Sequence, residues 1–432
     1  MLVLLFVFIM LFWGIKHNIK TTTSSPYILA PDNMVLLLFA LSCMVASFNY
    51  NRWGDISVLT FFVVILALLS FVLGASFAKS KTKTKVSGYK TPLPLIIPRY
   101  VTVCVIIMMA IVTYLQYKDT LTLVGSRGLG IIALSLATRE SIYMEDLSID
   151  HSALVWQGLY ASKAVVYIYL LVILHQKIYF KKSIWDIKII PIIIYIVQIL
   201  LSTGRSEFIY LTYAILFYLY YFKKQKNKWS LNDDKFFFKY GIIGLAGFMA
   251  VFLYIANLRN EGSVDVTRTI SEYVGSPIYA YDNYLNENGI MATSSYFGEY
   301  TMLFLYSIGR ALKLTTLAGV DTLPPVSLPG AETNIYTCLF RYTHDYGIII
   351  MLVIVFFIGY FYSKIFKKIK SSVMNYKMIA LYTFLSYPLV EFTIEERFMT
   401  TLISARTIFL CLYIYYLFDI IVKTGDKRYV SL

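Results

Sequence analysis

The sequence predicts an all-α fold, a polytopic bundle of transmembrane helices with one large external loop, and three observations carry this prediction. The chain of 432 residues is 58% hydrophobic and only 15% charged, which no soluble domain of this length matches. Its apolar residues gather in long runs with few charged residues. Its basic residues gather in alternate connections between those runs, so the net charge of +14 reflects membrane topology and not a nucleic-acid partner. We expect a single integral membrane domain over residues 1–432.

Eleven apolar runs are long enough, or nearly so, to cross a hydrocarbon core about 30 Å thick. They lie near residues 2–15, 34–48, 56–77, 100–117, 153–175, 187–202, 208–222, 237–256, 347–365, 378–393 and 402–422. The first run is the weakest. It has no basic segment before it and no small-residue cleavage site, so it resembles a reversed anchor more than a removable signal peptide.

The topology follows from the positions of the basic residues. Six alternate connections hold 26 of the 39 lysines and arginines, which marks them as cytoplasmic. An odd number of spans then places the N-terminus outside and the C-terminus inside. Two outward connections are long, residues 118–152 and residues 257–346. Within the larger one, residues 300–314 are apolar at helical spacing but too short to span, so we expect an interfacial or re-entrant helix, or one that covers the protein's own core.

The cations outside the cytoplasmic connections differ in kind, because they comprise ten arginines and three lysines. The planar fork of arginine suits bidentate recognition of phosphate or carboxylate. The candidate anion-binding residues are Arg205, Arg259, Arg310, Arg341 and Arg397. Residues 257–346 also contain nine acidic residues against five basic ones, so ion pairs within the loop are the alternative. An anion would have to be held by a few converging arginines and not by the overall charge of the loop.

Candidate general bases gather at the end of the large loop and in the last outer turn. They are His344, Asp345 and Glu396, with Glu395 and Glu299 as alternatives. A histidine beside an aspartate is more often a structural hydrogen-bonding pair, and that reading stays open. The sequence contains no GxxxxGK[ST], GxGxxG or HExxH motif, and its four cysteines lack metal-type spacing. We therefore expect no cofactor and no metal site.

Two segments carry a resemblance to a known family. Asn334-Ile335-Tyr336-Thr337, followed by Arg341 and Asp345-Tyr346-Gly347 at the start of a span, resembles the corresponding stretch of oligosaccharide repeat-unit polymerases, the O-antigen polymerases of the Wzy type. Thr203-Gly204-Arg205 on a tight hairpin resembles a second stretch of that family. The residues that the resemblance carries over are Arg205, Asn334, Thr337, Arg341, Asp345 and Gly347.

The resemblance implies a GT-C-like glycosyltransferase of the bacterial inner membrane with its active site facing the periplasm. Such enzymes transfer a growing glycan en bloc from undecaprenyl pyrophosphate to the non-reducing end of a new lipid-linked repeat unit, without a metal or a nucleotide sugar. The implied partners are undecaprenyl-pyrophosphate-linked oligosaccharides, membrane lipid and a chain-length regulator protein. Here Arg205, Arg341 and Arg397 are expected to bind the pyrophosphate, while Asn334 and Thr337 belong to the substrate-binding set.

Two other functions remain as alternatives. An O-antigen ligase uses the same donor but passes the glycan to lipid A core, a phosphorylated acceptor for which more outward basic charge is expected. A lipid-linked oligosaccharide flippase or transporter would place its polar groups near the bilayer midplane and often carries repeated halves. The sequence shows no internal repeat, and its polar residues collect in one outer loop.

Overall fold

The computed structural model describes residues 1–18, 27–80, 92–125, 130–144, 151–202, 206–230, 266–329, 331–371 and 375–425. The described chain is mostly helical with a few short strands, which confirms the predicted all-α class. It divides into two compact units. The first comprises Met1–Ser87, Val264–Ser372 and Leu385–Thr407, and the second comprises Gly88–Ser263, Val373–Phe384 and Ile408–Leu432.

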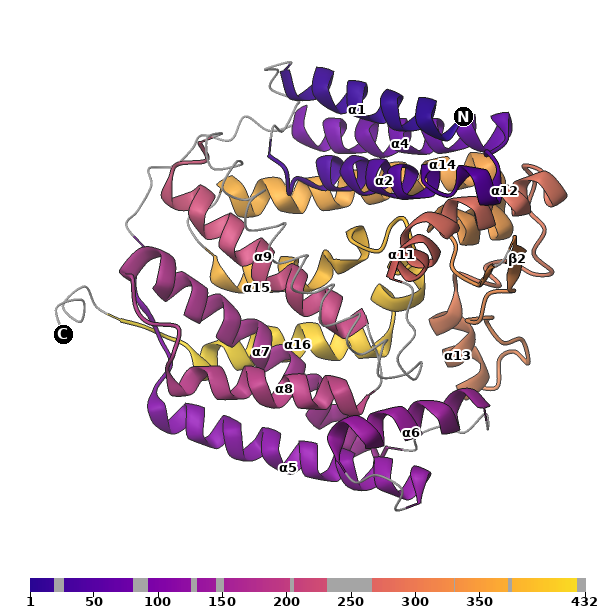
Figure 1. The fold of residues 1–432 in the computed structure, drawn as a ribbon. Coiled ribbons are helices and arrows are strands. Elements are labelled where there is room, and N and C mark those ends of the chain that lie inside the picture. The colour runs from indigo at the N-terminus through magenta and orange to yellow at the C-terminus, as the bar shows by residue number, and fades with distance from the viewer. Residues whose placement is uncertain are drawn as a thin grey trace. The chain divides into compact units, whose positions relative to one another are not determined.

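The first unit is built on four helices that lie side by side in Figure 1. They are α1 (Leu2–Asn18), α2 (Pro31–Ser47), α4 (Val58–Ser80) and α14 (Leu339–Ser371). Helices α4 and α14 form the most extensive of these contacts. The Ser70 hydroxyl of α4 donates a hydrogen bond to the Leu352 carbonyl of α14 at 2.7 Å, which satisfies a polar group inside an otherwise apolar interface.

The described residues from 266 to 338, which precede α14, form short elements. They are α11 (Val266–Ile270), a π-helical turn (Ser271–Gly275), α12 (Ser276–Asn288), α13 (Leu303–Ala311), and the antiparallel strands β2 (Val326–Leu328) and β3 (Ala331–Thr333). Helix α13 lies within the stretch for which the sequence predicts a short apolar helix, and none of its residues is buried. The turn-rich residues before β2 contain two consecutive prolines, Pro324 and Pro325, which exclude a regular helix there.

The second unit consists mainly of α5 (Arg99–Val124), α6 (Ile131–Met144), α7 (Ala153–Phe180), α8 (Ile190–Leu201), α9 (Ser206–Lys226), α15 (Tyr376–Leu385) and most of α16 (Ala405–Ile421). Helix α7 packs against α5, α8 and α9. Strands β1 (Leu95–Ile96) and β4 (Lys423–Thr424) pair antiparallel. The predicted connection 118–152 thus contains the last turns of α5 and the whole of α6.

In the described part of the chain, four helices, α4, α5, α7 and α14, are long and apolar enough to cross a membrane. Three shorter apolar helices, Leu2–Lys16, Pro31–Ser47 and Ile187–Leu201, coincide with other predicted runs. These lengths are those of a membrane protein. The run predicted at 378–393 is divided, because α15 ends at Leu385 and a 3₁₀ turn at Tyr387–Leu389 follows, where Pro388 has no N–H to donate. The predicted run at 237–256 lies outside the described residues.

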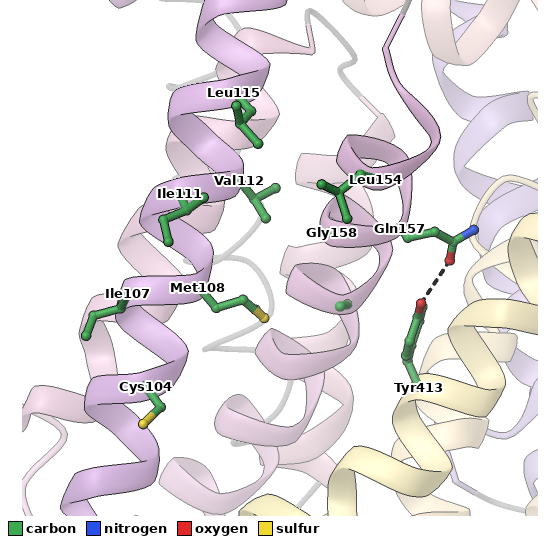
Figure 2. A pocket seen from close by; sticks show the side chains of 11 residues that line it. Cys104, Ile107, Met108, Ile111, Val112, Leu115, Leu154, Gln157, Gly158 and Tyr413 are labelled. Atoms are coloured by element: carbon green, nitrogen blue, oxygen red, sulfur yellow. Dashed lines mark hydrogen bonds between the residues drawn. The ribbon is translucent and has the colours of Figure 1, made fainter.

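An apolar groove of about 590 Å³ lies between α5 and α7 in the second unit, and we call it the α5–α7 groove. Figure 2 shows Ile107, Met108 and Ile111 of α5 along it and Tyr413 of α16 beside Gln157. The Tyr413 hydroxyl donates to Gln157 Oε1 at 2.9 Å, which pairs the polar atoms of the lining with each other. The groove therefore offers hydrocarbon contacts and no charged group.

Candidate functional site

The candidate site lies in the first unit, where α14 begins, and Gly347 determines its backbone geometry. Gly347 has φ 73° and ψ 171°, and an added Cβ would lie 3.2 Å from both the Ala292 nitrogen and the Ile290 oxygen. In a regular helix the Ile348 N–H would donate to the His344 carbonyl. It donates instead to Ile290 at 3.0 Å. Glycine is thus required for both its conformation and its close approach to the backbone.

The His344 carbonyl freed by this break accepts hydrogen bonds from the N–H groups of Thr293 and Ser294, at 2.9 and 3.1 Å. The large loop is thereby fixed to the first turns of α14. Asp345 adds a second anchor, because its carboxylate accepts from the backbone N–H groups of Tyr300 and Thr301 and from the Thr301 hydroxyl at 2.7 Å. Two separate parts of the loop are therefore held by consecutive residues of one helix.

His344 and Asp345 also contact each other, with Nδ1 3.1 Å from Oδ1. An ionised carboxylate beside Nδ1 favours the tautomer that carries its proton there, so Nε2 is left as a proton acceptor. Nε2 has no hydrogen-bond partner in the described part of the chain, and the side chain is 13% exposed. A histidine oriented in this way can act as a general base, with the carboxylate as its positioning partner.

Aromatic rings surround His344 on several sides. The Tyr300 ring centroid lies 4.2 Å from that of His344, and Phe340 and Tyr284 lie at 5.9 and 6.1 Å. Phe340 lies one helical turn before His344, and the Tyr336 ring stacks on it at a centroid distance of 4.0 Å. Phe340, Tyr284 and Tyr336 are buried, whereas Tyr300 is partly exposed. Tyr300 is thus the most accessible ring of this group.

Arg341 is almost completely buried, with 1% of its side chain exposed. Its guanidinium donates to the carbonyl oxygens of Tyr300 at 2.9 Å, Val320 at 3.2 Å and Asp321 at 2.7 Å. Nη2 also lies 3.5 Å from Glu395 Oε1. The arginine therefore joins two loop segments that are twenty residues apart, and in this geometry its Nη1 and Nη2 groups donate to the protein itself.

Arg397 forms the more accessible cationic centre, since 24% of its side chain is exposed. Its Nε lies 3.1 Å from Glu391 Oε2, and its Nη2 lies 2.5 Å from Glu395 Oε2. Glu395 thus bridges Arg341 and Arg397. Burial raises the pKa of the Glu395 carboxyl above its usual value, although both arginines act to lower it. The carboxylate at the centre of this cluster is consequently easier to protonate than an ordinary glutamate.

Glu396 holds the turn that follows Arg397. Its carboxylate accepts from the backbone N–H groups of Phe398 at 2.6 Å, Met399 at 2.8 Å and Thr400 at 3.0 Å, and from the Tyr342 hydroxyl at 2.6 Å. Glu396 is buried, and four donors surround its two oxygens. This arrangement serves to position the turn, and it leaves little capacity for taking a proton from a substrate.

The remaining predicted site residues are dispersed. Asn334 is exposed between β3 and α14, and Thr337 is buried with no hydrogen-bond partner for its hydroxyl among the described residues. Arg310 is exposed at the end of α13. Glu299 accepts from the Ser295 N–H at 2.8 Å. Arg205 and Arg259 lie outside the described residues. The structure therefore brings together His344, Asp345, Arg341, Arg397 and Glu395 around Tyr300, with Glu396 supporting the turn beside them.

Three members of the site were not predicted as such. Tyr342 supports Glu396, Asp321 supplies a carbonyl to Arg341, and Glu391 pairs with Arg397. The sequence does indicate Glu391, because a carboxylate inside an apolar run is energetically costly and is typical of a functional or paired position. Neither Tyr342 nor Asp321 has a comparable signal, since each depends on contacts between residues distant in the chain.

No family model matches this sequence, and no curated protein or solved structure matches it.

Proposed function

We propose that this chain is a glycosyltransferase of the bacterial inner membrane that polymerises oligosaccharide repeat units carried on undecaprenyl pyrophosphate, with its site at the periplasmic face. The proposal begins from the sequence resemblance to Wzy-type polymerases. The observation that carries it in the structure is the hydrogen bond of His344 to Asp345 beside the cluster of Arg341, Glu395 and Arg397, at the start of a long apolar helix.

In the proposed reaction, His344 Nε2 accepts the proton of the acceptor sugar's hydroxyl. The hydroxyl oxygen attacks the anomeric carbon of the donor glycan. The bond from that carbon to the pyrophosphate oxygen breaks, and undecaprenyl pyrophosphate leaves with the electron pair. Asp345 stabilises the imidazolium that forms, as a positioning residue that does not itself take the proton. A positioned general base of this kind contributes about 10²- to 10⁴-fold in rate.

The leaving pyrophosphate needs a cation, and Arg397 is the described arginine best suited to it. Its guanidinium is partly exposed and paired with Glu391 and Glu395. A pyrophosphate must compete with those carboxylates. The raised pKa of Glu395 favours this exchange, because protonation of Glu395 removes its charge and releases an arginine fork to the anion.

Arg341 has a different role in this proposal. Its donors hold the carbonyl oxygens of Tyr300, Val320 and Asp321, so it keeps the loop against the start of α14 and does not bind substrate in this geometry. The loop would then act as a fixed wall of the site. Loss of Arg341 should impair the site through displacement of Tyr300 and the Asp345 contacts.

Deletion of the gene and a glycan gel test the proposal. We expect the deletion strain to carry surface glycan of one repeat unit, and the restored wild-type gene to regenerate a ladder of lengths. His344→Ala should fail to restore the ladder while the protein accumulates normally in the membrane. His151→Ala is the matched control, because His151 makes a similar contact with Asp119 at 2.8 Å in the second unit.

The other outcomes separate the alternatives. A deletion strain that loses all glycan, single units included, would indicate ligation or flipping and would contradict polymerisation. A full ladder with His344→Ala would exclude His344 as the base. If both histidine variants lost the ladder equally, the effect could not be assigned to the His344 pair, and the proposed base would be rejected.

A further inference from the structure

A second apolar groove lies in the first unit, and part of its lining directly follows Arg397 in the chain. It has a volume of about 500 Å³ and lies between α14 and the segment 398–403. We call it the α14 groove. Its lining includes Phe357, Phe361 and Tyr362 of α14 with Phe398, Leu402 and Ile403 of the facing segment.

The floor and the rim of the α14 groove differ in exposure. Tyr362 and Phe398 form a buried floor, and their rings meet edge to face at a centroid distance of 5.4 Å. The Tyr362 hydroxyl donates to the Leu385 carbonyl at 2.7 Å, so the one polar atom of that ring is satisfied inside the protein. Phe357 and Ile403 at the rim are 60% and 51% exposed. The groove is thus an open, apolar channel along a helix long enough to span a membrane.

The α14 groove adjoins the arginine cluster through neighbouring residues of the chain. Phe398 and Met399 line the groove, and their N–H groups both bond to the Glu396 carboxylate. Arg397 directly precedes them, and its carbonyl accepts from the Leu402 N–H at 3.0 Å. Residues Phe398–Leu402 form a π-helical turn that lines the groove. The residue just before this turn, Arg397, has a partly exposed guanidinium. π-helical turns frequently occur at functional sites.

We propose that the α14 groove holds the polyprenyl chain of the lipid-linked donor and presents its pyrophosphate to Arg397, an inference that rests on the proposed function. A lipid with a long apolar tail and an anionic head matches this arrangement, because the cation Arg397 is followed in the chain by apolar residues of the groove. Apolar contact then supplies binding along the tail, while the guanidinium fixes the position of the head.

The α5–α7 groove provides an internal comparison. It has a similar volume and an equally apolar lining, but its polar groups are the paired Gln157 and Tyr413 side chains, with no cation. An ordinary acyl chain would occupy either groove. Of these two grooves, the α14 groove is the one whose lining directly follows a partly exposed arginine in the chain, so substitutions in the two grooves should have different effects.

The experiment uses the full-length protein in lipid nanodiscs and a polyprenyl pyrophosphate that carries a diazirine on its chain. After irradiation, the labelled peptides are mapped by mass spectrometry. We expect labels in α14 around Phe357 and in residues 398–403. Ile403→Trp should reduce them about tenfold, the factor expected when a bulky ring displaces about two methylene contacts. Ile111→Trp, in the α5–α7 groove and 55% exposed, is the matched control and should leave them unchanged.

Competition by unlabelled lipids and an Arg397→Gln variant test whether the labelling is specific for polyprenyl pyrophosphate. Excess unlabelled polyprenyl pyrophosphate should abolish it, and excess phosphatidylethanolamine should not. Arg397→Gln should weaken labelling by the pyrophosphate probe and leave labelling by a polyprenol probe unchanged. Equal competition by the phospholipid, or labels confined to the α5–α7 groove, would overturn the inference. A normal glycan ladder with no label in the α14 groove rejects only this inference, whereas a labelled groove with no ladder rejects only the polymerase function.

Discussion

Gly74 of α4 and Gly359 of α14 allow these two helices to approach each other's backbone. A Cβ added at Gly74 would lie 2.0 Å from the Phe356 carbonyl oxygen, and one added at Gly359 would lie 2.2 Å from the Phe71 carbonyl oxygen. Small residues permit such contact between membrane helices, where dispersion and hydrogen bonding drive association. Because α14 carries His344 and Asp345 in its first turns, this contact also fixes the helix that positions the candidate base.

Gly74→Ala and Gly359→Ala should each destabilise the protein, because the added carbon meets backbone atoms that a side-chain rotation cannot move. We expect a loss of about 1–3 kcal/mol in the free energy of unfolding, the usual range for overpacking. Thermal unfolding of the purified protein in detergent measures the effect. Gly14→Ala in α1 is the control, since nothing lies within 4 Å of its added Cβ. Unchanged melting temperatures in the two interface variants would contradict the close approach.

Glu396→Gln should reduce stability, because the amide presents an N–H₂ group to donors that now surround a carboxylate. Hydrogen bonds to charged groups contribute about 1.5–3 kcal/mol each, so the loss should exceed about 1.5 kcal/mol. Tyr342→Phe removes one of the four donors and should cost less. Chemical unfolding curves of both variants measure the difference. An inactive Glu396→Gln protein with wild-type stability would instead restore Glu396 as a catalytic residue.

The sequence predicted the helical class and the membrane-length helices because both depend on local composition and spacing. It also placed several candidate residues where α14 begins. The contacts within that site join distant positions, and no periodic pattern predicts them. Arg341 illustrates this, since its partners Tyr300 and Val320 are 41 and 21 residues away. Composition likewise suggested an unbroken run across 378–393, whereas Pro388 and the paired Glu391 interrupt it.

Arg341→Lys should loosen the loop, because a single ammonium cannot reproduce a planar fork directed at three carbonyl groups. The Val320 N–H bonds to the Glu299 carbonyl at 2.8 Å, and we expect its hydrogen exchange to accelerate about tenfold or more, as the loss of about 1.4 kcal/mol would produce. Mass spectrometry of deuterated peptides across residues 299–321 measures it. Arg310→Lys, at an exposed position of α13, should not change exchange there. Equal protection in wild type and Arg341→Lys would show that the arginine does not hold the loop.

We expect the stability of the protein to depend on pH through the ionisation of Glu395. Burial raises the pKa of this carboxyl above 4.5, so the folded protein disfavours its ionised form relative to the unfolded chain. Below that ordinary value the group is protonated in both states. As pH rises from there through the raised pKa, the unfolded chain releases the proton first and the wild-type protein loses stability. The substituted amide cannot ionise, so the melting temperature of Glu395→Gln relative to wild type should rise as pH increases from about 4.5 through the raised pKa of Glu395. Melting curves in detergent at several pH values test this, with Glu332→Gln at an exposed site as the control. A difference that falls with pH would show that the ion pairs with Arg341 and Arg397 outweigh the burial of the carboxylate.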